Sequence, residues 1–243
     1  MLIALVMALA QAADPPPVWD WSEPRRYRLS VNEALSPAIQ VGLADNIMAS
    51  LTSYAVTLEV TCAASGKSAG AGGTTVACKV DAATLSGGAG DASDQAKLDE
   101  SVRQLESWIL AATVDFVQKS DGEIKRVGEV EPGPNADRMS QYRTAWLNGA
   151  LAGCLGSLDV VVSLDADEWR TPIPWGSLKV HVTERTDDSM TFEGEHGEIA
   201  RIAVQFDRRA RVITKSRISY AAHGNTATDH WNQERTSEIL EAR

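Results

Sequence analysis

The sequence is short of histidine, cysteine, positive charge and long apolar runs. Its 243 residues include 4 His and 3 Cys, and 33 acidic residues exceed 23 basic ones, which gives a formal charge of −10. Nonspecific affinity for nucleic acid comes from many Lys and Arg contacts with phosphates, so this charge argues against a nucleic-acid partner. No internal stretch approaches the 18 or more apolar residues of a membrane-spanning helix. We therefore expect a soluble mature protein without a transmembrane segment.

Motifs that identify a reaction are also missing. The sequence contains no G-x-S-x-G elbow, His-Glu-x-x-His helix, Cys-x-x-Cys pair or glycine-rich dinucleotide turn. Gly66-Lys67-Ser68 resembles the end of a phosphate-binding loop, but Thr61 stands where the earlier glycine belongs and no helix is predicted to follow. We expect a protein that is not an enzyme and has no cofactor. A hydrolase or metalloenzyme assembled from distant residues is the less favoured alternative.

The histidines do not form a paired metal-binding motif, because none has a second histidine two or four residues away. His196 lies in the acidic segment 193–198, which would suit a divalent ion, although a solvated hairpin turn is the favoured interpretation. Asp165, Asp167 and Glu168 resemble part of a calcium loop, but the glycine and distal glutamate of such a loop are missing. We predict no metal site.

A short apolar run lies at the start of the sequence. Leu2 to Leu9 precede Ala10-Gln11-Ala12, the small-x-small pattern of a signal peptidase site, so we predict cleavage after Ala12. The run lacks a positively charged region before it, and the alternative is a disordered or buried apolar N-terminus. We expect a signal peptide at residues 1–12, a flexible spacer at 13–25 and a single domain at 26–243. The mature protein is predicted to be periplasmic or extracellular.

Three cysteines in an exported chain fit one disulfide and one thiol left over. Alternate residues of the segment 54–62 are apolar as far as Cys62, and Cys78 lies on the apolar face of a second β-rich segment. A Gly- and Ser-rich stretch at 66–73 would connect the two as a hairpin, so we predict a Cys62–Cys78 disulfide. Closing a loop of about fifteen residues stabilises a fold by roughly 3 kcal/mol. Two buried free thiols are the alternative, and Cys154 is expected to be a buried helical thiol.

The spacing of apolar residues predicts an α+β fold that is mostly antiparallel. Helical spacing occurs over 94–107 and again from Met139 to Cys154. Asp121-Gly122 separates two β-rich runs, 113–117 and 123–127, as in a hairpin. We expect a curved sheet or open barrel with two amphipathic helices packed on one side, because short turns require antiparallel neighbours. Further strands are expected at residues 26–33, 158–164, 178–184, 189–193, 200–206, 212–220 and 226–237, the arm before Cys62 is expected to begin as early as Ile47, and Gly87 to Gly90 is expected to interrupt the strand pattern.

The last third of the sequence contains the strongest candidate for a ligand site. Alternation predicts a basic stripe, made up of Arg211, Lys215 and Arg217 on one strand face, with Ile213 on the same face and Arg201 on the neighbouring strand. A basic stripe on an acidic protein would recognise a carboxylate, a phosphate or a lipid head group. The favoured alternative is a solvent face with cross-strand salt bridges, whose acidic partners would be Glu193, Glu195 and Glu234.

These patterns lead to two hypotheses for a noncatalytic envelope protein. In the first, the curved sheet binds an apolar or amphipathic ligand. Exported carriers of lipids and lipoproteins use that architecture, and the analogy is one of fold alone. In the second, a sheet edge or the basic strand docks a protein partner. Trp169 and Trp175 beside Pro172 to Pro174 would line a pocket mouth in the first hypothesis, although core and loop packing is the favoured explanation.

Overall fold

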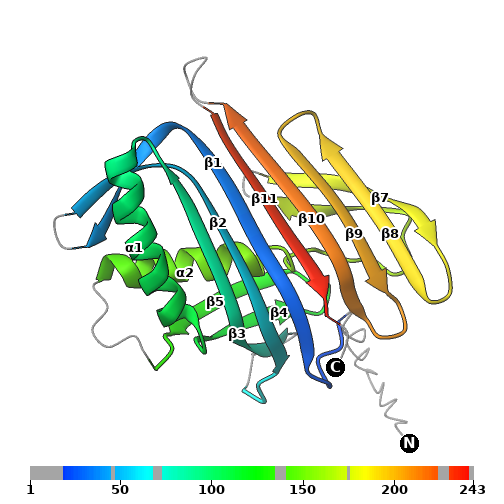
Figure 1. Cartoon of the computed structure of the whole chain (residues 1–243). Coiled ribbons are helices and arrows are strands. Elements are labelled where there is room, and N and C mark those ends of the chain that lie inside the picture. Colours follow the sequence, from blue (N-terminus) through cyan, green and yellow to red (C-terminus); the bar gives the residue numbers. More distant parts are fainter. Residues whose placement is uncertain are drawn as a thin grey trace, which may run out of the picture.

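In a computed structural model of the chain, the described residues form one open sheet of eleven antiparallel strands with two helices (Figure 1). The structure describes residues 19–44, 47–67, 73–134, 141–173, 176–223 and 230–240. The helices are α1 (Ala92–Ile109) and α2 (Gln141–Leu155). The strands are β1 (Arg25–Ala44), β2 (Ile47–Ala64), β3 (Gly73–Ala89), β4 (Thr113–Lys119), β5 (Ile124–Glu131), β6 (Glu168–Ile173), β7 (Gly176–Arg185), β8 (Ser189–His196), β9 (Ala200–Asp207), β10 (Val212–His223) and β11 (His230–Ile239).

The sheet consists of two meanders joined at the centre. The strand order is β5-β4-β3-β2-β1-β11-β10-β9-β8-β7-β6, so every neighbour is consecutive in sequence except the central pair. There β1 pairs with β11 in a ladder that runs from Tyr27 opposite Ile239 to Ser36 opposite His230. The predicted α+β class, with an open antiparallel sheet and two helices, is confirmed. The sheet does not close into a barrel, and β5 and β6 form its two edges.

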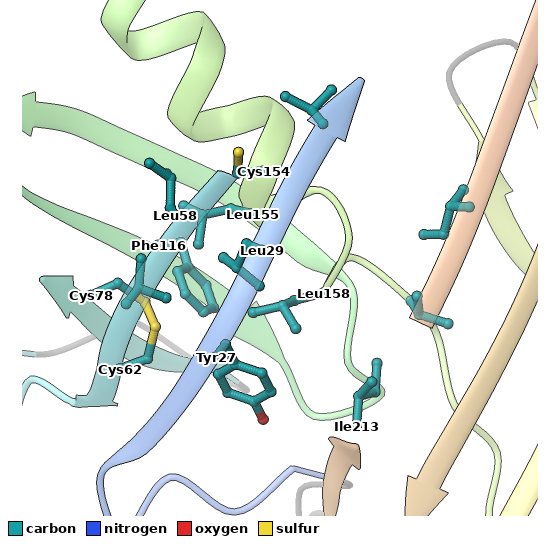
Figure 2. Packing of buried hydrophobic residues seen from close by; sticks show 14 of the residues in the cluster. Tyr27, Leu29, Leu58, Cys62, Cys78, Phe116, Cys154, Leu155, Leu158 and Ile213 are labelled. Atoms are coloured by element: carbon teal, nitrogen blue, oxygen red, sulfur yellow. A yellow bond between two sulfur atoms is a disulfide. The ribbon is translucent and has the colours of Figure 1, made fainter. Parts of the chain in front are cut away.

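One face of the sheet is covered and the other faces outward. Along β1, Tyr27, Leu29 and Val31 are buried, whereas the residues between them are more exposed. Both helices pack on the covered inner face. An added Cβ at Gly87 would lie 2.7 Å from Leu98 of α1, so the strand approaches that helix closely. Figure 2 shows the α2 end of this core, where Leu155 and Leu158 lie against Leu29, Leu58 and Phe116.

The hairpin, disulfide and first helix form as the sequence predicts. Cys62 and Cys78 are cross-strand partners on β2 and β3 and are joined by a buried disulfide. Asp91 caps α1 by accepting a hydrogen bond from the Asp94 backbone N–H at 2.9 Å. The β4–β5 hairpin turns at Gly122, whose φ of +102° is accessible mainly to glycine. A Cβ there would also lie 2.4 Å from Trp19 Nε1.

The predicted strand at 158–164 is wrong. Leu158, Val160 and Val162 are buried at alternate positions, but they belong to an extended segment outside the sheet. Its backbone hydrogen bonds are irregular. The N–H of Val162 donates to the Asp121 carbonyl at 2.8 Å, and the N–H of Val161 donates to Thr171 Oγ1 at 3.2 Å. An extended segment lying on a core buries every second residue, as a strand does.

Two further strands differ from the expectation. Residues 168–173, where no strand is predicted, form the edge strand β6, and β3 continues through Gly87 as far as Ala89, so the expected interruption at Gly87 to Gly90 is wrong. Trp169 packs edge-on against Phe192, with ring centroids 4.8 Å apart, as core packing predicts. Trp19 and Trp21, within the expected spacer, are buried in the core. The predicted signal sequence to Ala12, Met139 and Trp175 lie outside the described residues. Neither described helix is long and apolar enough to span a membrane.

Candidate functional site

Both edges of the sheet are blunted, which disfavours docking by strand addition. On β5, the N–H of Ile124 donates to Asp159 Oδ1 at 2.7 Å, and the N–H of Val130 donates to Asn148 Oδ1 at 3.1 Å. On β6, Pro172 has no N–H to offer. A free edge recruits a further strand through its unpaired backbone groups, and here several of those groups are already bonded or missing.

The inner face is covered by the chain itself. Inward residues of the second meander, such as Phe192, Val204 and Ile218, have at most 2% of their surface exposed. They belong to one core cluster with Leu158 and Val160 of the extended segment. The described part of the inner face is therefore a packed core.

A groove of about 720 Å³ crosses the outward face of the sheet. Residues that are paired with one another across successive strands form a register row. The groove lies along one central row and is lined by the rows on either side of it. The central row consists of Gly87, Tyr54, Glu33, Gln233 and Tyr220. The side chains of the central row point inward, so its backbone forms the floor of the groove. The first flanking row is Ser86, Ala55, Asn32, Glu234, Ser219 and Arg201, and the second is Gly88, Ser53, Ala34, Asn232 and Ala221.

Several small polar side chains in the groove form no side-chain hydrogen bond with another described residue. Within the described residues, no side-chain hydrogen bond involves Asn32, Ser53, Ser86, Ser219 or Asn232. Outward positions of a sheet usually carry longer polar or β-branched side chains. The small residues of the two flanking rows instead lower the surface and leave donors and acceptors facing the groove.

A second hollow of about 560 Å³ continues the groove over β7 to β10. It shares Arg201 and Ser219 with the first, so the two hollows meet there. His181, Glu193 and Glu195 also line it. Within the described residues, no group of three His, Cys, Asp or Glu side chains is placed to hold a metal ion.

The predicted basic stripe is divided by the fold. Arg201 and Arg217 line the second hollow, whereas Lys215 and Arg211 line neither hollow. Lys215 is exposed on the outward face. The register shifts between Ile213 and Lys215, so Ile213 is buried rather than sharing the face of the basic residues. That bulge is the reason why simple alternation gave the wrong face for Ile213.

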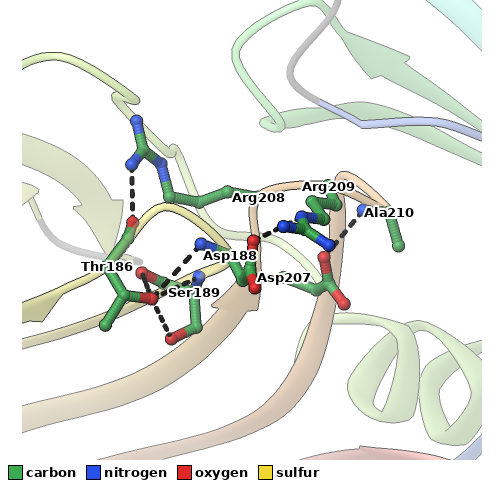
Figure 3. Close-up of polar contacts among 7 residues, drawn as sticks. All are labelled: Thr186, Asp188, Ser189, Asp207, Arg208, Arg209 and Ala210. Atoms are coloured by element: carbon green, nitrogen blue, oxygen red, sulfur yellow. Dashed lines mark hydrogen bonds and ion pairs between the residues drawn. The ribbon is translucent and has the colours of Figure 1, made fainter.

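Arg211 belongs to the turn before β10 and adopts a φ of +55°. Figure 3 shows this turn fastened to the neighbouring β7–β8 turn. Arg208 Nη1 donates to the Thr186 carbonyl at 2.7 Å, and Arg209 forms an ion pair with Asp188. Arg211 therefore belongs to this turn and lies outside β10, the strand that carries Lys215 and Arg217.

A hydrogen-bonded network of polar side chains lies beneath the groove, on the inner face of the sheet. Tyr54 Oη and Gln233 Nε2 both donate to Glu33 Oε2, at 2.8 and 2.5 Å. Arg235 Nε donates to Gln233 Oε1 at 2.6 Å, and its guanidinium lies 5.3 Å from the ring centre of Tyr220. Burial, with a further contribution from Glu33, raises the pKa of Tyr54. The phenol is therefore a hydrogen-bond donor at neutral pH.

Comparisons with known proteins do not place this chain in a family. No family model matches it, and no curated protein matches it. Among solved structures, the crystal structure of MucB in complex with MucA(peri) aligns with 89% of this chain and 89% of its own chain, at 10% identity and a TM-score of 0.12. A likeness at that TM-score carries no argument about fold or function.

Proposed function

We propose that this protein is a noncatalytic binding protein of the cell envelope that docks an extended segment of a partner polypeptide in the outward groove. The observation that carries the proposal is the alignment of mostly small residues in two register rows, one across β3, β2, β1, β11, β10 and β9 and the other across the first five of these strands. Neighbouring strands are about 4.8 Å apart, so the groove extends for roughly 24 Å. An extended peptide of about seven residues has that length.

The lining favours a polypeptide over other ligands. Side-chain amides and hydroxyls from Asn32, Asn232 and Ser53 face the groove, and such groups suit the N–H and C=O groups of a peptide backbone. A lipid would need an apolar cavity, and the inner face that would supply one is packed against α2 and the 158–164 segment. The formal charge of −10 disfavours nucleic acid.

The envelope assignment is part of the same proposal. It is supported by the disulfide between Cys62 and Cys78, a type of bond that persists in oxidising compartments. The apolar N-terminal run with its small-x-small pattern supports it independently.

Site-specific photocrosslinking tests the docking function. A photoreactive residue would replace Ala34, which lines the groove, or Ala82, which is exposed on the same face outside it. In cells of the natural host, we expect Ala34 to yield a discrete polypeptide adduct and Ala82 to yield none. The adduct should disappear when Ala55→Trp fills the groove. Absence of an adduct at Ala34, or equal adducts at both positions, contradicts docking in the groove.

Native mass spectrometry of the protein purified from the periplasm separates docking from carriage of a ligand. We expect the bare protein, or the protein with a polypeptide bound. A small apolar molecule that co-purifies and is released on denaturation would overturn the proposal and favour carriage.

A further inference from the structure

Charged side chains are concentrated at one end of the groove. The outward residues that β1, β2 and β3 contribute to it are uncharged: Asn32, Ala34, Ser53, Ala55, Ser86 and Gly88. Within the described residues, the outward charges of the lining come from the other end, over β8 to β11 and the β8–β9 turn, where they are Glu193, Glu195, Glu198, Arg201, Arg217 and Glu234. The groove therefore has a neutral half and a charged half.

Pairing within the charged half leaves an excess of carboxylates. Arg217 binds Glu234, with Nη2 2.6 Å from Oε2. Within the described residues, Glu193, Glu195 and Glu198 form no ion pair, and all three are exposed. Arg201, opposite Glu195 in the ladder, remains as the only other cation of the described lining. Three carboxylates then face one guanidinium.

We infer that the polypeptide segment bound in the groove is neutral and polar over β1 to β3 and carries Lys or Arg side chains over β8 and β9. This inference rests on the proposed docking function. The complementarity is reinforced by the net charge of the whole chain, which attracts cationic segments at long range. Steering of this kind raises the association rate and selects against acidic partners. An acidic segment would meet an excess of carboxylates at that end of the groove, three against the one guanidinium of Arg201.

A peptide titration tests the inference with the full chain. The probes are blocked hexalysine and blocked hexaglutamate, added to isotope-labelled protein at low ionic strength and followed by amide chemical shifts. Hexalysine should shift the amides of residues 193–198 and 201, and its affinity should fall as salt is added. Hexaglutamate should shift none of them. Hexalysine shifts confined to other parts of the protein would overturn the inference.

A charge-matched pair of variants makes the test specific. The triple variant Glu193→Gln, Glu195→Gln, Glu198→Gln should weaken hexalysine binding by about tenfold. The control triple variant, Glu100→Gln, Glu129→Gln, Glu184→Gln, removes the same number of exposed carboxylates outside the groove and should change binding by less than about twofold. Equal losses in the two variants would show that net charge alone attracts the peptide.

The two proposals fail in different ways. If the groove triple variant leaves both the hexalysine affinity and the Ala34 adduct unchanged, the basic-segment inference is wrong and docking stands. If Ala55→Trp leaves the Ala34 adduct unchanged, docking in the groove is itself wrong.

Discussion

Removing the hydroxyl of Tyr27 is expected to stabilise the protein. The side chain of Tyr27 is fully buried, and its ring centroid lies 6.2 Å from that of Trp21. Within the described residues, its buried Oη has no hydrogen-bond partner. Burial also raises the pKa of this phenol, which favours the neutral form. Tyr27→Phe keeps the ring and its packing while deleting the one polar atom.

The size of the effect follows from the cost of a buried polar group without a partner, which is about 1–3 kcal/mol. We expect the free energy of unfolding to rise by about 1 kcal/mol, the lower end of that range, because deleting the hydroxyl also loses some van der Waals contact. For a chain of this size the melting temperature should rise by about 2–4 °C. Urea unfolding followed by tryptophan fluorescence measures the free energy, and calorimetry measures the melting temperature.

Tyr54→Phe is the matched control. It removes a phenol that donates to Glu33 Oε2 at 2.8 Å, so it should lower the free energy of unfolding by about 1–2 kcal/mol. Opposite signs for the two Tyr→Phe changes are expected from the contacts of their hydroxyls. A loss greater than about 0.5 kcal/mol for Tyr27→Phe would refute the reasoning, since it would mean that the hydroxyl is bonded.

Three further predictions follow from buried groups and from the hairpin turn. Burial raises the pKa of Asp159 above 3.8, so ionisation destabilises the folded state and stability falls as pH rises from about 4 through the raised value. Asp159→Asn should remove that loss, which urea unfolding between pH 4 and 7 would detect, and parallel pH profiles would contradict it. Replacing both Cys62 and Cys78 by Ala should lower the free energy of unfolding by roughly 3 kcal/mol, measured without reductant, and an unchanged value would contradict a formed disulfide. Gly122→Ala should destabilise by more than about 1 kcal/mol in thermal unfolding because of its positive φ and the contact with Trp19, whereas a neutral result would show that the turn adapts.

Features that depend on local sequence could be predicted. The helix over Ala92–Ile109 follows from its apolar spacing and its Asp91 cap, and the β4–β5 hairpin follows from Asp121-Gly122. The Cys62–Cys78 disulfide could be predicted because both cysteines lie on the apolar faces of adjacent strands that are joined by one connection. Each of these features involves residues that are close together in the sequence.

Features that depend on partners far along the chain could not be predicted. The 158–164 segment and β6 have similar alternation, and only the presence of β7 beside β6 makes one a strand. The groove needs Ser86, Asn32 and Ser219 in one row, which is set by the register of four ladders. The sequence does show small residues at alternate positions within single strands, but this pattern indicates a groove only when the register of the strands is known.

The pairing of β1 with β11 has a consequence for how the protein folds. The central ladder joins residues that are between 194 positions (Ser36 and His230) and 212 positions (Tyr27 and Ile239) apart, while every other ladder joins strands that are neighbours in sequence. Each meander can assemble by local zipping, but the seam between them needs both to be present. Until β11 arrives, β1 presents a long unpaired edge, a surface prone to aggregate. That edge stays unpaired until residues 230–239 have been synthesised, so the last strand of the chain is also the one that protects its first.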